Sequence, residues 1–173
     1  MIPLYFAHGA GAGPTDPPLP ALRARLGAGY AVTTPDLGPP DPEIWTRRIK
    51  SDLAALPDGT LLVGHSLGAS HLLKCLAELG PAVRPRALVG LAAPLWGMPG
   101  WEADGFALPA WAPEALAHLP LRMFQSRDDE AVAFDHLAAW GRLFPHARLY
   151  PLDGQTHVFT GDLSAIAIAI SEL

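Results

Sequence analysis

A serine between two glycines, in Gly64-His65-Ser66-Leu67-Gly68, is the stretch of this sequence with the clearest chemical meaning. The apolar residues 60–63 precede it as a strand would, and residues 69–79 follow it with apolar side chains at the 3–4 spacing of a helix. A G-x-S-x-G segment between a strand and a helix is typical of a nucleophile elbow, in which flanking glycines keep Cβ atoms away from a strained serine. An ordinary Gly-Ser turn shares the short pattern, but the flanking elements favour the nucleophile.

A serine nucleophile needs a base in contact with its hydroxyl and a third group that fixes the tautomer of that base. The chain has seven histidines that compete for the role. His157 is the predicted base because it lies in the loop after the last predicted strand, as the order Ser…Asp…His requires. His65 adjoins the serine, but its side chain is expected to point away, and His8 is expected to hold a loop. The others are interpreted as solvated or structural: His71, His118, His136 and His146.

Two adjacent carboxylates, Asp128 and Asp129, compete for the role of the acid. They follow the fifth predicted strand, and as neighbours they cannot both point at one imidazole. Spacing alone leaves the choice between them open.

A glycine-rich turn, residues 8–13, follows the first predicted strand directly. Such a turn exposes backbone N–H groups that can hold an anion, as an oxyanion hole does. A dinucleotide-binding loop is the competing interpretation. It fits poorly, because the third glycine of G-x-G-x-x-G is absent and Pro14 interrupts the segment.

The segment from 94 to 120 carries Trp96, Trp101, Phe106 and Trp111 among prolines and glycines, with little periodicity. One interpretation is a connection pinned to the core by its aromatic side chains. The other is a short cap whose tryptophans, together with His8, line an apolar acyl pocket.

Strands and helices alternate along the chain, which predicts one α/β domain over residues 1–173. We expect a three-layer αβα sandwich around a mainly parallel sheet of about six strands. The predicted strands cover 2–7, 30–36, 60–63, 86–93, 121–126 and 147–152. Residues 165–170 alternate as a strand could, but the chain order favours a helix. Since sites on such sheets form where strands end, the glycine-rich loop, the serine, the aspartates and the last histidine are expected at one edge.

Composition excludes several classes of function. With 12 Lys+Arg, a net charge of −5 and no basic cluster, the 173 residues do not indicate a nucleic-acid partner. No apolar run approaches the ~20 residues of a membrane span, and the first residues enter a strand pattern without the features of a signal peptide. One cysteine, Cys75, excludes an internal disulfide and fits a cytoplasmic protein. We expect neither a metal nor a cofactor. The sequence leaves monomer and dimer open.

The chain resembles the α/β-hydrolase superfamily, and within it the small, nearly lidless serine hydrolases related to retinoblastoma-binding protein 9 and bacterial YdeN. The resemblance covers the whole chain and rests on the first strand with its glycine-rich loop, the elbow, residues 126–132 and residues 156–159. In that family the acid is typically followed by two variable residues, an aliphatic residue and a proline. Asp129 fits with Ala133 in place of the proline, so the resemblance implies Asp129 as the acid and a turn-forming or capping role for Asp128. Gln155-Thr156 departs from the family, which more often has a glycine before the histidine.

The activity implied is hydrolysis of a small carboxylic ester or thioester through Ser66, His157 and Asp129. The oxyanion would be held by the backbone N–H groups of Leu67 and of Ala10 or Gly9. A carboxylesterase-like enzyme is thus the leading hypothesis. The alternative is a catalytically weak, hydrolase-like binding protein. A thioesterase acting on acyl carriers would need a basic docking surface near the cap, and the sequence has no such cluster.

Overall fold

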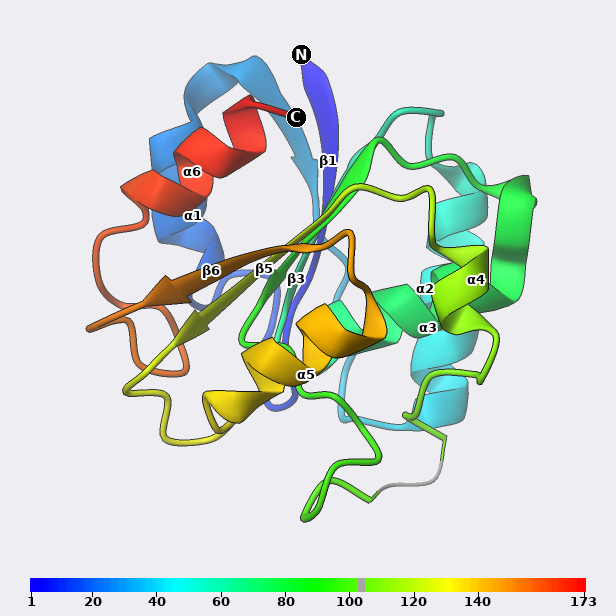
Figure 1. Cartoon of the computed structure of the whole chain (residues 1–173). Coiled ribbons are helices and arrows are strands. Elements are labelled where there is room, and N and C mark those ends of the chain that lie inside the picture. The colour runs from blue at the N-terminus through cyan, green and yellow to red at the C-terminus, as the bar shows by residue number, and fades with distance from the viewer. Residues whose placement is uncertain (103–104) are drawn as a thin grey trace.

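A computed structural model describes residues 1–102 and 105–173 of the chain. Within these residues, six strands form one sheet in the order β2-β1-β3-β4-β5-β6, and every neighbouring pair is parallel (Figure 1). The strands are β1 (Ile2–Ala7), β2 (Tyr30–Thr33), β3 (Leu61–His65), β4 (Ala87–Leu91), β5 (Leu121–Ser126) and β6 (Arg148–Leu152). The helices are α1 (Leu19–Leu26), α2 (Pro42–Ala55), α3 (Leu67–Leu79), α4 (Ala112–Ala115), α5 (Asp135–Leu143) and α6 (Ser164–Ser171). The predicted αβα sandwich is confirmed.

Both faces of the sheet are covered, α1 and α6 on one side and α2, α3, α4 and α5 on the other (Figure 1). The alternation of side chains in β1 explains the two layers. Leu4 and Phe6 point into the cluster that contains α1 and α6, whereas Tyr5 and Ala7 point into the cluster that contains α2 and α3. All four side chains are buried. A central parallel strand buried on both faces must be apolar throughout, as this one is.

The edge strand β2 is shorter than the predicted strand over 30–36. Its last paired residue is Thr33, opposite Tyr5. Pro35 lacks the N–H that a further ladder bond would need, so the chain leaves the sheet before it. At the start of the next helix, α2, the Asp41 carboxylate accepts the N–H of Ile44 at 2.8 Å, and proline occupies the first helical position.

The C-terminal segment is helical, and the strand alternative for 165–170 is wrong. Ile166, Ala169 and Ile170 are buried in the cluster that contains α1, while Ile168 is 58% exposed. This burial follows the 3–4 spacing of a helix, because only one stripe of an otherwise apolar segment contacts the core.

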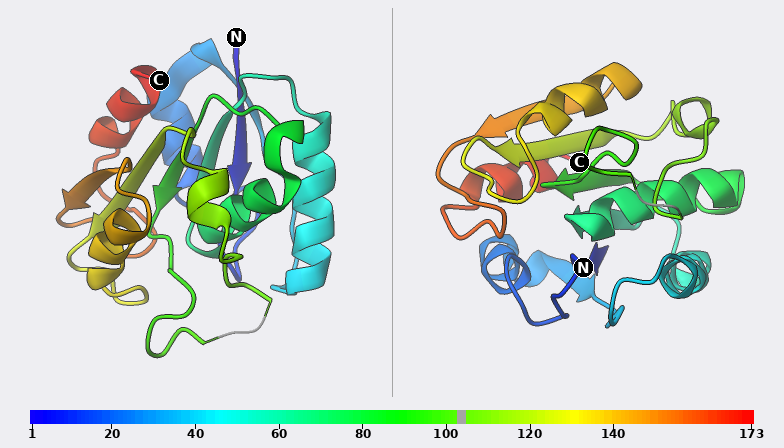
Figure 2. Two further views of the ribbon diagram at one scale, coloured as in Figure 1. Left: turned by 45° about the vertical axis from the view of Figure 1, so that its right-hand side comes forward. Right: turned by 90° about the horizontal axis from the view of Figure 1, so that it is seen from below.

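The segment from 94 to 120 contains the short helix α4, which the sequence did not indicate. Residues 103–104, which belong to the expected cap, lie outside the described residues. Figure 2 shows that the segment first projects beyond the ends of the strands and then returns along the helical layer. Among the helices of the described part, none combines the length and the apolar composition needed to cross a membrane.

His71 lies in the middle of α3 and is fully buried. Its Nε2 is 2.9 Å from the hydroxyl oxygen of Thr46, and its ring meets the rings of Trp45 and Phe106 edge-on. Burial disfavours the imidazolium and lowers the pKa of His71 to about 4.

This burial predicts a pH dependence of stability. Between pH 6.5 and 4 the unfolded chain binds a proton at His71 that the folded protein does not, so stability decreases as the pH decreases. Lowering the pH from about 7 to about 5 should lower the free energy of unfolding by about 2 kcal/mol through this residue. In urea unfolding, His71→Gln should reduce the difference in free energy of unfolding between pH 7 and pH 5 by about the same amount. His118→Gln, at an exposed position, is the matched control for the loss of an imidazole. If the free energy of unfolding changed with pH as much in His71→Gln as in the wild type, burial of a neutral His71 would not be the cause.

Candidate active site

Ser66 lies at the junction of β3 and α3 with a backbone that few L-residues adopt, φ 51° and ψ −126°. Its N–H donates to the carbonyl of Leu91 in β4 at 2.8 Å, which ties the turn to the sheet. Ser66 is partly exposed, although the residues on both sides of it in the turn are buried. The junction therefore presents one side chain to solvent, as the elbow pattern predicts.

The two glycines of the elbow are required by close packing. A Cβ on Gly64 would lie 2.4 Å from the Cα of Ala69, and a Cβ on Gly68 would lie 2.4 Å from the carbonyl oxygen of Ala7. Both distances are far inside van der Waals contact with backbone atoms that cannot rotate away. The turn can hence be this sharp only with glycine at both positions.

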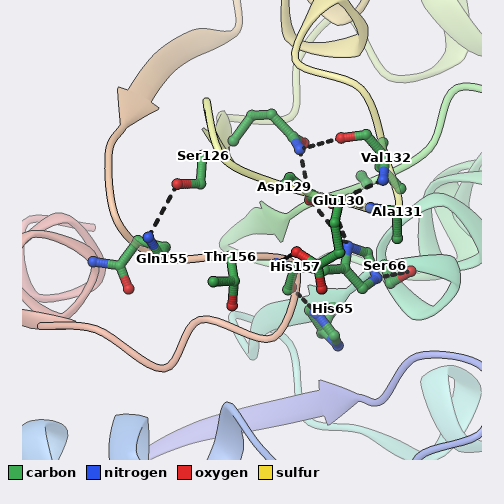
Figure 3. Close-up of polar contacts among 12 residues, drawn as sticks. His65, Ser66, Ser126, Asp129, Glu130, Ala131, Val132, Gln155, Thr156 and His157 are labelled. Carbon is green, nitrogen blue, oxygen red and sulfur yellow. Dashed lines mark hydrogen bonds and ion pairs between the residues drawn. The ribbon is translucent and has the colours of Figure 1, made fainter.

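The structure brings Ser66, His157 and Asp129 together at the edge where the parallel strands end (Figure 3). The Nε2 of His157 is 3.0 Å from the hydroxyl oxygen of Ser66. The Nδ1 of His157 is 3.0 Å from both carboxylate oxygens of Asp129. Because a carboxylate can only accept, Nδ1 carries the hydrogen and Nε2 presents its lone pair to the serine hydroxyl. This is the tautomer that a general base requires.

Asp129 is the most strongly held member of this group, and its side chain has no exposed surface. It accepts the N–H groups of Ala131 and Val132 at 2.8 Å each, and the side-chain amide of Gln125 at 2.7 Å. Burial alone would raise the pKa of Asp129, but the hydrogen bonds from His157 and from the two backbone N–H groups outweigh it and lower that pKa. The carboxylate stays ionised beside the imidazole.

Asp128, the other aspartate, points elsewhere. It accepts the hydroxyl hydrogen of Ser126 and, at 3.4 Å, the N–H of Thr156. The hydrogen bond from Ser126 lowers the pKa of Asp128. Asp128 thus contacts the backbone of the histidine loop (residues 154–159) and not the imidazole.

The glycine-rich loop passes directly against the serine. A Cβ on Gly9 would lie 3.0 Å from the Cβ of Ser66 and 3.1 Å from the Nδ1 of His65, so a side chain there would press on the elbow. Leu67 begins α3, and an N–H in the first turn of a helix has no carbonyl partner within that helix. The backbone N–H of Leu67 therefore has no partner within its helix, and the other predicted oxyanion donors, Gly9 and Ala10, belong to the loop that passes against Ser66.

His8 is buried and holds the glycine-rich loop. Its Nδ1 donates to the carbonyl of Gly9 at 2.8 Å, and its Nε2 accepts the N–H of Leu37 at 2.9 Å. Both ring nitrogens are used within the protein. The structure therefore places His8 beneath the loop and does not bring it into an open pocket, contrary to its expected role as a pocket residue.

Two of the three tryptophans lie near the elbow. Trp96 donates its indole N–H to the hydroxyl of Ser70, one turn beyond the elbow in α3, at 3.2 Å. Its ring stacks on Phe106 and meets Trp101, with centroids 5.1 and 5.2 Å apart. Trp101 in turn meets the ring of His136 at 5.3 Å. These aromatic side chains join α3 to the start of α5.

Trp111 does not belong to this group. It is 58% exposed, and its indole N–H reaches the carbonyl of Ala77 at 3.4 Å. Ala77 is eleven residues beyond Ser66 in sequence, about 16 Å along the helix. The expectation that Trp111 lines the pocket is corrected. An apolar cavity of about 300 Å³ is lined by residues 95–98 and 108–110 together with Pro113 and Leu143. Ser66, Asp129 and His157 are not among these lining residues.

Three further residues make contacts that were not anticipated from the sequence. Gln125 donates both to Asp129 and to the carbonyl of Val132, at 2.7 and 2.9 Å. His65 points away from the serine hydroxyl, as expected, but its Nε2 is 2.8 Å from the carbonyl oxygen of His157. Glu130 accepts the backbone N–H of His157 at 3.1 Å. Their positions in the sequence were the one available signal: His65 adjoins Ser66, Glu130 adjoins Asp129, and Gln125 lies four residues before Asp129.

The chain belongs to the serine hydrolase family, whose pattern matches residues 8–161. Its parallel sheet has the α/β-hydrolase fold that the resemblance implied, and solved structures share this fold. A comparison with curated protein sequences found no match.

Solved structures share the fold over nearly the whole chain. The ydeN gene product from B. subtilis has a TM-score of 0.84 at 20% identity, covering 99% of this chain and 98% of its own. Est1E from Butyrivibrio proteoclasticus has a TM-score of 0.73 at 17% identity, with coverages of 99% and 86%. The esterase domain from a Rhodothermus marinus protein has a TM-score of 0.73 at 21% identity, with coverages of 99% and 84%. At these identities the likeness establishes the fold.

The two aspartates can be distinguished by matched amide substitutions. Asp129→Asn should lower kcat for p-nitrophenyl acetate by about 10⁴-fold, because an amide cannot hold the Nδ1–H tautomer of His157 in the same way. Asp128→Asn should cost at most a few-fold, since its amide oxygen can still accept the contacts of the carboxylate. Equal losses in the two variants would contradict the assignment of the acid.

Proposed function

We propose that the protein hydrolyses carboxylic esters or thioesters of small acyl groups, with Ser66 as nucleophile, His157 as general base and Asp129 as the acid. The observation that carries the proposal is the unbroken chain of contacts from serine hydroxyl to imidazole to buried carboxylate, 3.0 Å at each step. Membership in the serine hydrolase family supports the same reaction. The fold is also that of a solved esterase domain and of a dienelactone hydrolase from Anabaena variabilis.

In the first half-reaction, the Nε2 of His157 takes the proton of Ser66 as the serine oxygen attacks the carbonyl carbon. The carbonyl π electrons move to its oxygen, and the N–H groups of Leu67 and of Ala10 or Gly9 stabilise that charge. Collapse of the intermediate breaks the bond to the leaving alcohol or thiol, which receives the proton from His157. Asp129 remains ionised and stabilises the imidazolium throughout.

In the second half-reaction, water takes the place of the leaving group. His157 removes a proton from the water as its oxygen attacks the acyl-serine carbonyl, and the same N–H groups stabilise the second oxyanion. Collapse releases the carboxylic acid and returns the proton to Ser66. No redox partner or cofactor enters this balance.

The acyl group is proposed to contact the aromatic side chains next to the elbow, Trp96 and Trp101. Trp96 is fixed by its hydrogen bond to Ser70, one turn beyond the nucleophile, and Trp101 packs on it. These surfaces favour an apolar acyl chain over a charged one.

The reaction is tested by hydrolysis of p-nitrophenyl acetate and p-nitrophenyl butyrate. We expect turnover by the wild-type protein, and a loss of about 10⁶-fold in kcat for Ser66→Ala. Ser51→Ala, at an exposed position of α2, is the matched control and should retain wild-type kcat. If the wild-type protein gave no turnover, or if Ser66→Ala retained it, the esterase proposal would fail and a binding role would be favoured.

A further inference from the structure

The histidine loop is bound through its backbone as well as through the imidazole. Three successive N–H groups of this loop are each accepted by a side-chain oxygen of the acidic turn (residues 126–130), which begins with the last residue of β5. The pairs are Gln155 with Ser126 at 3.1 Å, Thr156 with Asp128 at 3.4 Å, and His157 with Glu130 at 3.1 Å. Figure 3 shows Ser126 next to Gln155, and Glu130 next to His157.

The spacing of the acceptors explains how one short turn performs two tasks. Ser126, Asp128 and Glu130 occupy alternate positions and accept consecutive N–H groups of the loop. Asp129, between the last two, faces the imidazole of His157 instead. The same turn therefore fixes both the ring and the peptide of the proposed base.

The carbonyl on the other side of the same residue is held from the elbow. The Nε2 of His65 is 2.8 Å from the carbonyl oxygen of His157, and a carbonyl only accepts, so this nitrogen donates. Burial lowers the pKa of His65 to about 4, which keeps the imidazole neutral at pH 7. The peptide groups of His157 are thus held by Glu130 at the N–H and by His65 at the carbonyl.

The backbone of the loop explains why such contacts are needed. Thr156 has φ 54° and Phe159 has φ 55°, in the left-handed region that disfavours residues with a side chain, and most of all a β-branched one. A loop with these angles on both sides of His157 does not hold its conformation through local preference. Contacts from outside the loop must determine it.

We propose that Glu130 is a positioning residue for catalysis: its carboxylate, as acceptor of the His157 N–H, keeps the imidazole aligned between Ser66 and Asp129. This inference rests on the proposed hydrolase function. Glu130 does not touch the reacting atoms. It acts through the backbone of the base, so its removal affects the rate of the chemical step and leaves substrate binding in place.

Three substitutions of Glu130 distinguish the effect of its side-chain length from the effect of its charge. Glu130→Gln keeps the length and an acceptor oxygen but loses the charge, Glu130→Asp keeps the charge but is one methylene too short, and Glu130→Ala loses both. We expect Glu130→Ala and Glu130→Asp to lower kcat for p-nitrophenyl acetate by about 10–100-fold, with KM within about twofold of wild type. Glu130→Gln should stay within about threefold of wild-type kcat. Glu43→Ala, an exposed glutamate at the start of α2, is the control.

Amide hydrogen exchange of His157, measured by NMR, gives a second readout that does not depend on turnover. Exchange should be faster in Glu130→Ala and Glu130→Asp and close to wild type in Glu130→Gln. Retained kcat in Glu130→Ala, or an equal loss of kcat in Glu130→Gln, would overturn the positioning role while the hydrolase function stands. A wild-type protein with no turnover would instead overturn the proposed function and the catalytic part of this inference with it.

Discussion

The backbone of Ser66 is the constraint on which the rest of the site depends. Its φ of 51° costs a residue with a side chain about 1–3 kcal/mol. The surroundings supply the compensation: the Ser66 N–H bonds to Leu91 in the sheet, and α3 packs close enough to the end of β1 that Gly68 cannot carry a Cβ. The sheet and the helix thus hold the hydroxyl in one direction. A relaxed turn would leave the serine oxygen without its contact to His157.

The histidine loop meets this elbow with strained residues of its own. Thr156 adopts a left-handed conformation that a glycine would adopt at little cost. Side-chain contacts from the acidic turn and from His65 offset the cost of having a side chain there. Local sequence preferences stabilise neither the elbow nor the histidine loop. Hydrogen bonds between the two hold them together, and both therefore determine the distance between Ser66 and His157.

The sequence predicted well whatever depends on chain order and on local pattern. The alternation of strands and helices led to the αβα sheet, and the order of residues pointed to Ser66 and His157, because parallel strands bring their ends to one edge. Spacing could not separate Asp129 from its neighbour, since the choice depends on which side chain accepts the N–H groups of the following turn. The contact of Glu130 was not predicted, and the pocket role predicted for Trp111 was wrong, because both contacts join residues far apart in the chain.

The central claim is that the turn after β3 presents one activated serine. It is tested most directly by locating the covalent adduct that a fluorophosphonate forms with the wild-type protein, by mass spectrometry of its peptides. The account predicts a single adduct on Ser66 that forms in the native protein and is lost in urea, because activation depends on the folded contact with His157. No adduct in the native protein, or an adduct on another serine, would contradict it.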